Sequence, residues 1–107
     1  MNIIIQSVNF KASSALENFV REKVSKLFNH CDNIMRADIV LRKRENGNLE
    51  NKLCEIRLII PGYDHFVKVG SEVYEKSILR AVDTLQKILR RNKTRLLAER
   101  NENQSLL

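Results

Sequence analysis

The chain is poor in the residue types on which many functional sites depend. Its 107 residues include no Trp, one Pro, three Gly and two Cys, and only 6% are aromatic. Three scattered glycines exclude a Gly-rich phosphate-binding loop. The shortage of aromatic residues argues against a broad stacking platform for single-stranded nucleic acid.

The two cysteines, Cys31 and Cys54, are too few and too far apart for a zinc motif. A lone pair in a cytosolic chain is more often reduced than bridged, so we expect both to be small core residues. His30 and Asp32 flank Cys31, but no second group of ligands exists, which favours a structural or surface role over a metal site.

Groups suited to catalysis are also scarce. No nucleophile has an evident base, and no paired carboxylates stand in an apolar setting. Glu72, Glu75 and Asp83 lie near one predicted helix start and could in principle hold a metal, but solvated acids on a helix surface are the commoner case. We therefore expect no enzymatic activity, no metal and no cofactor.

Long apolar runs are missing as well. No stretch reaches the roughly 20 apolar residues of a membrane span, and the N-terminus has no basic segment followed by a long apolar run. We therefore expect a cytosolic protein. The length suits one domain with a modest core, which we assign to residues 1–100, followed by a short polar tail at 101–107.

Positive charge is what the chain has in excess, with 19 Lys and Arg against 13 Asp and Glu and a formal net charge of +6. Residues 84–98 contain no acid. The basic residues in that segment are Lys87, Arg90, Arg91, Lys93 and Arg95. A cluster of this density predicts a polyanionic partner, with nucleic acid as the first candidate.

Helical periodicity places these cations on one side. At about 100° per residue, one stripe is formed by Lys76, Arg80, Lys87 and Arg91, flanked by Arg90 and Arg95. The opposite face carries Tyr74, Ile78, Leu85, Leu89 and Leu96. We therefore predict that the apolar face packs against a core while the basic stripe binds phosphate groups.

The periodicity of apolar residues predicts the order β-α-β-β-β-α. The expected elements are a strand at 3–8, a helix at 14–29, strands at 37–42, 54–60 and 64–70, and a helix from 71 to about 99. Turns are expected at 45–51 and at Pro61-Gly62. Ser14 and Glu17 form a capping box for the first helix, and Ser71 is the candidate N-cap of the second, with Glu72 in its first turn.

Each predicted helix has only one apolar face, so the economical packing lays both on one face of a four-stranded sheet. The last three strands read as an antiparallel meander. The other sheet face is expected to carry Asp38, Arg42, Glu55, Arg57 and Lys68. The predicted fold is a single α+β domain that resembles double-stranded-RNA-binding domains.

Two lysines of the first helix extend the basic surface. Lys23 lies close to Phe19 and Leu27 at the edge of the apolar stripe, so its stem should cover apolar surface while its ammonium group reaches solvent. Lys26 follows one turn later. A role in solubility alone is an equally good interpretation of Lys23.

The order of elements and two sequence runs resemble the ribosome hibernation-promoting factor family, which includes the ribosome-associated inhibitor. The runs are LENFVREKVSKL at residues 16–27, leading to Asp32-Asn33-Ile34, and VDTLQKILRRNKTRL at residues 82–96. The similarity covers residues 1–98. The chain is most similar to the short form, which lacks the second domain of longer members.

This resemblance implies a bacterial stress factor that binds the small ribosomal subunit in the channel of messenger RNA and of the A-site and P-site transfer RNAs. Translation would be blocked by occupancy, with a separate ribosome modulation factor as a possible partner. Positions that contact ribosomal RNA in the family match Lys23, Lys26, Lys87, Arg91, Lys93 and Arg95. The chain departs from the family in Thr84, where many members are basic, and in Arg90, an added charge.

Phe19 and Phe28 fit the core pattern, which leaves Tyr63, Phe66 and Tyr74 as the aromatics that can be exposed. Binding should therefore depend on phosphate contacts and shape, with weak sequence specificity. Two alternatives remain. One is a general structured-RNA-binding module, although double-stranded-RNA-binding domains usually begin with a helix. The other is a regulator of an acidic protein, encouraged by an older label of the family as a modulator of an alternative sigma factor.

Overall fold

The computed structural model describes the backbone of residues 2–45 and 49–105, and the side chains of those residues as far as Asn92. The elements are β1 (Ile3–Val8), α1 (Ser14–Ser25), a 3-10 turn η1 (Lys26–Asn29), β2 (Arg36–Lys43), β3 (Lys52–Ile60), β4 (Tyr63–Ser71) and α2 (Tyr74–Ser105). The predicted order β-α-β-β-β-α is confirmed. The centre of the turn expected at 45–51 lies outside the described residues.

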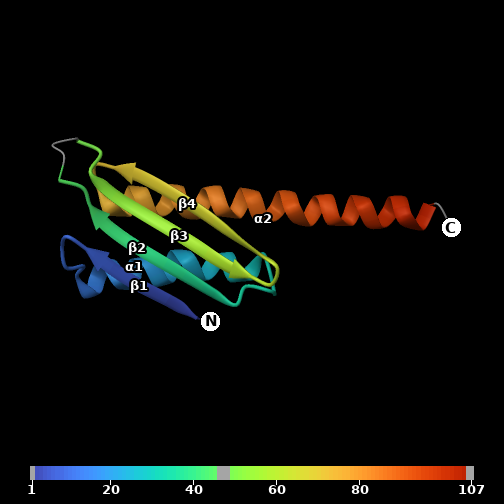
Figure 1. Ribbon diagram of the computed structural model, residues 1–107, viewed down its shortest axis with the longest axis horizontal. Coiled ribbons are helices and arrows are strands. Elements are labelled where there is room, and N and C mark those ends of the chain that lie inside the picture. The colour runs from blue at the N-terminus through green and yellow to red at the C-terminus, as the bar shows by residue number, and fades with distance from the viewer. Residues whose placement is uncertain (1, 46–48, 106–107) are drawn as a thin grey trace.

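The four strands form one mixed sheet in the order β1-β2-β3-β4. β1 and β2 run parallel, as their connection through α1 requires, and the β2-β3-β4 meander is antiparallel, as predicted. Both helices lie behind the sheet in the view of Figure 1, α1 along β1 and α2 along β3 and β4. The two helices also contact each other. The predicted α+β architecture, with both helices on one face, is confirmed.

The core lies between the sheet and the helices. Alternate strand residues point into it, and the strand contribution consists of Ala37, Ile39, Leu41, Cys54, Ile56, Leu58 and Ile60. The helices contribute Leu16, Val20, Val24, Ile78, Ala81, Val82, Leu85 and Leu89, and η1 adds Leu27. Within the described side chains, the apolar faces predicted from the sequence are therefore the ones that pack against the sheet, whereas Leu96 lies outside the described side chains.

The other sheet face is open and carries charges in pairs. Arg42 Nε lies 3.1 Å from Glu55 Oε2, and Arg57 Nη1 lies 3.6 Å from Asp64 Oδ2. Opposite charges on neighbouring strands compensate one another here. This face therefore differs from the basic helical side.

The first helix begins one residue away from the predicted cap. Ser13 is the N-cap, and its Oγ accepts a hydrogen bond from the Leu16 amide at 3.1 Å, so the predicted capping box of Ser14 and Glu17 is wrong. The preceding residue, Ala12, is buried and donates its amide hydrogen to another side chain, Ser7 Oγ, at 3.3 Å. Anchoring of the chain at Ala12 places Ser13 at the helix start.

Substitution of Ser13 and of Ser14 tests which of the two serines caps the first helix. We expect Ser13→Ala to lower the free energy of unfolding by about 0.5–2 kcal/mol, because an amide of the first turn loses its acceptor. Ser14→Ala, the matched control, should change it by less than about 0.5 kcal/mol. Urea unfolding followed by circular dichroism measures both. Equal losses in the two variants would contradict this assignment.

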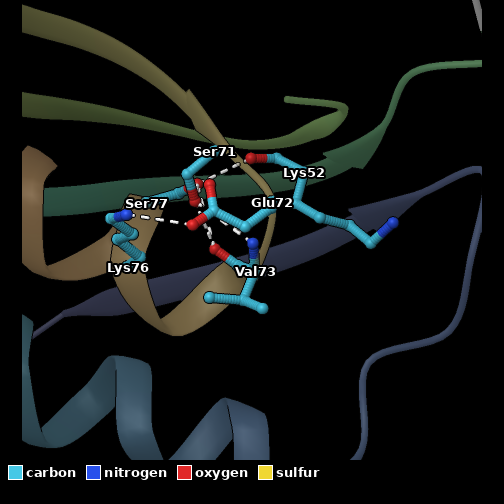
Figure 2. Close-up of polar contacts among 6 residues, drawn as sticks. All are labelled: Lys52, Ser71, Glu72, Val73, Lys76 and Ser77. Atoms are coloured by element: carbon cyan, nitrogen blue, oxygen red, sulfur yellow. Dashed lines mark hydrogen bonds and ion pairs between the residues drawn. The ribbon is translucent and has the colours of Figure 1, made fainter. Parts of the chain in front are cut away.

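The second helix also begins later than predicted. Ser71 is the buried last residue of β4, and α2 starts at Tyr74, so Ser71 is not the N-cap. As Figure 2 shows, Ser71 Oγ lies 2.8 Å from Ser77 Oγ, and the Ser77 hydroxyl donates to the Lys52 carbonyl at 2.6 Å. Ser71 Oγ also accepts from the Val73 amide at 3.3 Å. These buried hydroxyls join the first turn of α2 to β3 and β4 instead of capping the helix.

The end of α2 was predicted too early. The helix continues to Ser105, so most of the segment 101–107 that was expected to be a polar tail is a continuation of α2. No Gly or Pro follows residue 70 to end the helix. In Figure 1 the second half of α2 projects beyond the sheet, and the molecule measures 59 × 27 × 20 Å.

Candidate nucleic-acid interface

The outward side of α2 carries the predicted basic stripe. Its described cations are all exposed and comprise Lys76, Arg80, Lys87, Arg90 and Arg91. On the opposite side of the helix Ile78 and Leu85 are fully buried. Burial of these residues fixes the rotation of α2 about its axis and so turns the basic stripe toward solvent. The side chains of Lys93 and Arg95 lie outside the described part of the chain.

Two of the lysines form ion pairs within the helix or at its start. Lys76 Nζ lies 2.9 Å from Glu72 Oε1, and Lys87 Nζ lies 3.1 Å from Asp83 Oδ2. The hydrogen bond from Lys76 lowers the pKa of Glu72 below its usual value. Exposed pairs of this kind contribute little to stability because water screens both charges, so a phosphate group can compete for the ammonium groups.

The arginines of the stripe have no such partners. Within the described residues, no ion pair involves Arg80, Arg90 or Arg91. Thr84, noted in the sequence as a departure from the basic residue of many family members, donates its hydroxyl hydrogen to the Arg80 carbonyl at 2.9 Å and adds no charge. Among the described residues of α2, these guanidinium groups are therefore less neutralised than Lys76 and Lys87, whose acids lie four residues earlier in the chain.

The two lysines of the first helical segment differ in exposure. Lys23 is partly buried, with Nζ 5.4 Å from the centroid of the Phe19 ring and 3.6 Å from Glu22 Oε1. Its stem thus covers apolar surface, as predicted. Lys26 begins η1 and is exposed. Since α1 contacts α2, both lysines belong to the same helical side of the molecule as the stripe.

Two features near this surface were not anticipated. Arg21 of α1 is exposed, and its Nη1 donates to the Ile3 carbonyl at 3.5 Å, which ties α1 to the edge strand β1. At the end of the sheet, His65 Nε2 lies 3.3 Å from Asn92 Nδ2 and connects β4 with α2. No local sequence signal predicts either contact, because each joins elements far apart in the chain.

The described residues contain no group of three or more His, Cys, Asp or Glu side chains placed to hold a metal ion. Both cysteines are free. Cys54 is fully buried, and burial, with a smaller effect of the Glu55 charge, raises the pKa of its thiol to about 12. Cys31 is partly buried and packs against the core. Among the described segments, no helix combines the length and apolar character needed to cross a membrane.

Fold and surface together define a small α+β protein in which two helices cover one face of a mixed sheet and turn a basic side outward. The family model described as "Sigma 54 modulation protein / S30EA ribosomal protein" matches residues 3–97. The chain therefore belongs to this family, and the resemblance seen in the sequence is confirmed.

Two relatives support the assignment to this family. The "Ribosome hibernation promotion factor" of Deinococcus radiodurans is 30% identical over 95 residues, which are 88% of this chain and 50% of that protein. The chain thus spans about half the length of this relative. A second relative is the Thermus thermophilus Protein Y N-terminal domain, whose crystal structure is 27% identical in sequence and superposes with a TM-score of 0.71. The match covers 85% of this chain and 98% of the Thermus chain.

A third relative supports the fold alone. The structure of a ribosomal subunit interface protein from Coxiella burnetii superposes with a TM-score of 0.76 at 19% sequence identity. The match covers 88% of this chain and 99% of the Coxiella chain. The arrangement of strands and helices is therefore shared even where the sequences have diverged strongly.

Proposed function

We propose that this protein binds the small ribosomal subunit and its ribosomal RNA in the messenger and transfer RNA channel, and blocks translation there by occupancy. It would act in the cytoplasm without chemistry or cofactor. The proposed RNA-binding residues are Lys23, Lys26, Lys76, Arg80, Lys87, Arg90, Arg91, Lys93 and Arg95.

The observation that carries this proposal is the exposed, weakly neutralised basic side of α2. Arg80, Arg90 and Arg91 project from a helix that packs against the sheet through the buried Leu85. A rigid cationic surface suits the phosphates of folded RNA, whose shape it can match. The name of the relative in Deinococcus radiodurans supports a ribosomal partner.

Co-sedimentation of the chain with purified ribosomal subunits across a salt series tests the proposal. We expect binding to the small subunit with a slope of log affinity against log salt of about −4 to −5, the value when six of the nine proposed residues, those that match RNA contacts of the family, each bind a phosphate. A competing messenger with initiator transfer RNA should displace the protein. A chain that stays at the top of the gradient even at low salt would contradict the proposal.

The same experiment separates the two alternatives. Equal affinity for arbitrary duplex RNA and for ribosomes would indicate a general structured-RNA-binding module. Binding to an acidic protein such as a sigma factor in the absence of ribosomes would indicate a protein regulator. The net charge of +6 is compatible with both, so only competition and partner specificity distinguish them.

A further inference from the structure

The proposed function rests on phosphate contacts, but the three aromatic residues that the sequence leaves as candidates for exposure, Tyr63, Phe66 and Tyr74, could add base contacts. Tyr74 is unavailable, because its ring stacks on Phe10 at 4.5 Å between centroids and 11° between planes, with its hydroxyl buried. Phe66 lies on the open sheet face, and the Arg57 guanidinium carbon sits 4.9 Å from its ring centroid. Neither ring presents a free face beside the basic helical side.

Tyr63 differs from Tyr74 in its exposure and from Phe66 in the sheet face on which it lies. It is the first residue of β4, directly after the Pro61-Gly62 turn, where Gly62 adopts a φ of 91° that favours glycine. It pairs with Ile60, a core residue, so its side chain belongs to the helical face of the sheet. Yet Tyr63 is 50% exposed, because it lies at the end of the sheet.

The neighbours of Tyr63 leave its ring accessible and place it beside α2. The Tyr63 and His65 rings meet edge to face, 5.0 Å apart at 79°, so His65 covers at most one face of the tyrosine ring. His65 in turn contacts Asn92 of α2 at 3.3 Å. The exposed Arg91 precedes Asn92 in the same helical turn and projects toward the outward side of α2. The exposed Tyr63 ring thus lies at the end of the sheet, linked through His65 to the part of α2 whose outward side carries the arginines.

We infer that Tyr63 is a stacking site for one unpaired RNA base, whose flanking phosphates bind the arginines of α2. Every base has a π-face, so a single tyrosine supplies contact without a requirement for a particular base. His65 holds the ring from the side and Asn92 links this pair to α2. The inference rests on the proposed function and adds base contact to a surface that otherwise recognises phosphate.

Affinity for purified small ribosomal subunits, measured with the full chain, tests the inference. Tyr63→Ala should weaken binding about 5- to 150-fold, the usual range for loss of one stacked base, while the salt slope stays unchanged because no phosphate contact is lost. Tyr63→Phe should restore affinity. Phe66→Ala is the matched control and should bind like the parent. Affinity of Tyr63→Ala within about twofold of the parent would overturn the inference.

Fluorescence gives a second, independent readout. The chain contains no Trp, so Tyr63→Trp places its single tryptophan at the site, and this indole can be excited apart from the remaining Tyr74. Its emission should change on binding to the subunit as a base stacks on the indole, whereas Phe66→Trp on the open face should not respond. Unchanged emission of bound Tyr63→Trp would overturn the stacking inference while leaving the proposed function intact. Absence of binding by the parent chain would overturn both.

Discussion

A variant that carries both Lys87→Glu and Arg91→Glu is expected to lose affinity for the small ribosomal subunit by about 100-fold or more. Both side chains are exposed on the basic side of α2, where charge reversal replaces two phosphate contacts by repulsion. Each charge-assisted hydrogen bond is worth about 1.5–3 kcal/mol, so two losses exceed a factor of about 100. Co-sedimentation at constant salt measures the effect.

The fold should tolerate this change. Lys87→Glu removes an exposed ion pair with Asp83, and like charges four residues apart on a helix cost only about 0.2–0.5 kcal/mol per pair. Leu85 and Leu89 on the opposite face are untouched. Circular dichroism and the urea midpoint should therefore stay close to those of the parent.

A matched control carries Arg36→Glu and Lys68→Glu on the open face of the sheet. Both residues are exposed, and the net charge changes by the same amount as in the α2 variant. If phosphate binding depends on the helical side, this control should retain most of its affinity for the subunit. Equal loss in the two variants would mean that overall charge, not the α2 surface, governs binding.

Leu85→Ala is expected to lower the free energy of unfolding by about 2–5 kcal/mol. Leu85 is fully buried between α2 and the sheet, so truncation removes apolar contacts and leaves a cavity in the core. A domain of this size is stable by only about 5–15 kcal/mol, and such a loss is a large fraction of the total. Urea unfolding followed by circular dichroism gives the value.

Leu79→Ala on the same helix is the matched control. Leu79 is 46% exposed, so the identical truncation removes little buried surface and should cost less than about 0.5 kcal/mol. The difference between the two variants reports the orientation of α2. Similar costs at both positions would show that α2 packs with a different face toward the sheet.

The local ends of the helices show where sequence reasoning fails. Ser13 and Ser14 are adjacent serines, and only the anchoring of Ala12 by Ser7 decides that Ser13 is the cap. Ser71 has the residue type of an N-cap, but its hydroxyl serves the buried contact with Ser77. In each case a side chain five or six residues away, outside the capping motif itself, decides the role of the serine.

The candidate site was more predictable than the helix ends. The buried Ile78 and Leu85 follow the helical period, so the opposite residues, Lys76, Arg80 and Lys87, had to face solvent. The ion pairs of Lys76 and Lys87 could also be read from the four-residue spacing to their acids. In an amphipathic helix, burial of the apolar face also determines which residues are exposed.

The sequence by itself determined the order of elements, the apolar face of each helix and the basic face of α2, because the period of apolar residues is a local property that burial enforces. Only the tertiary structure decided which aromatic rings are available. Tyr74 is covered by Phe10, and Phe66 lies on the open sheet face against Arg57, whereas the half-exposed Tyr63 lies on the helical face beside His65, which contacts Asn92. The physical reason is that exposure of a ring depends on neighbours that the chain brings together from distant positions.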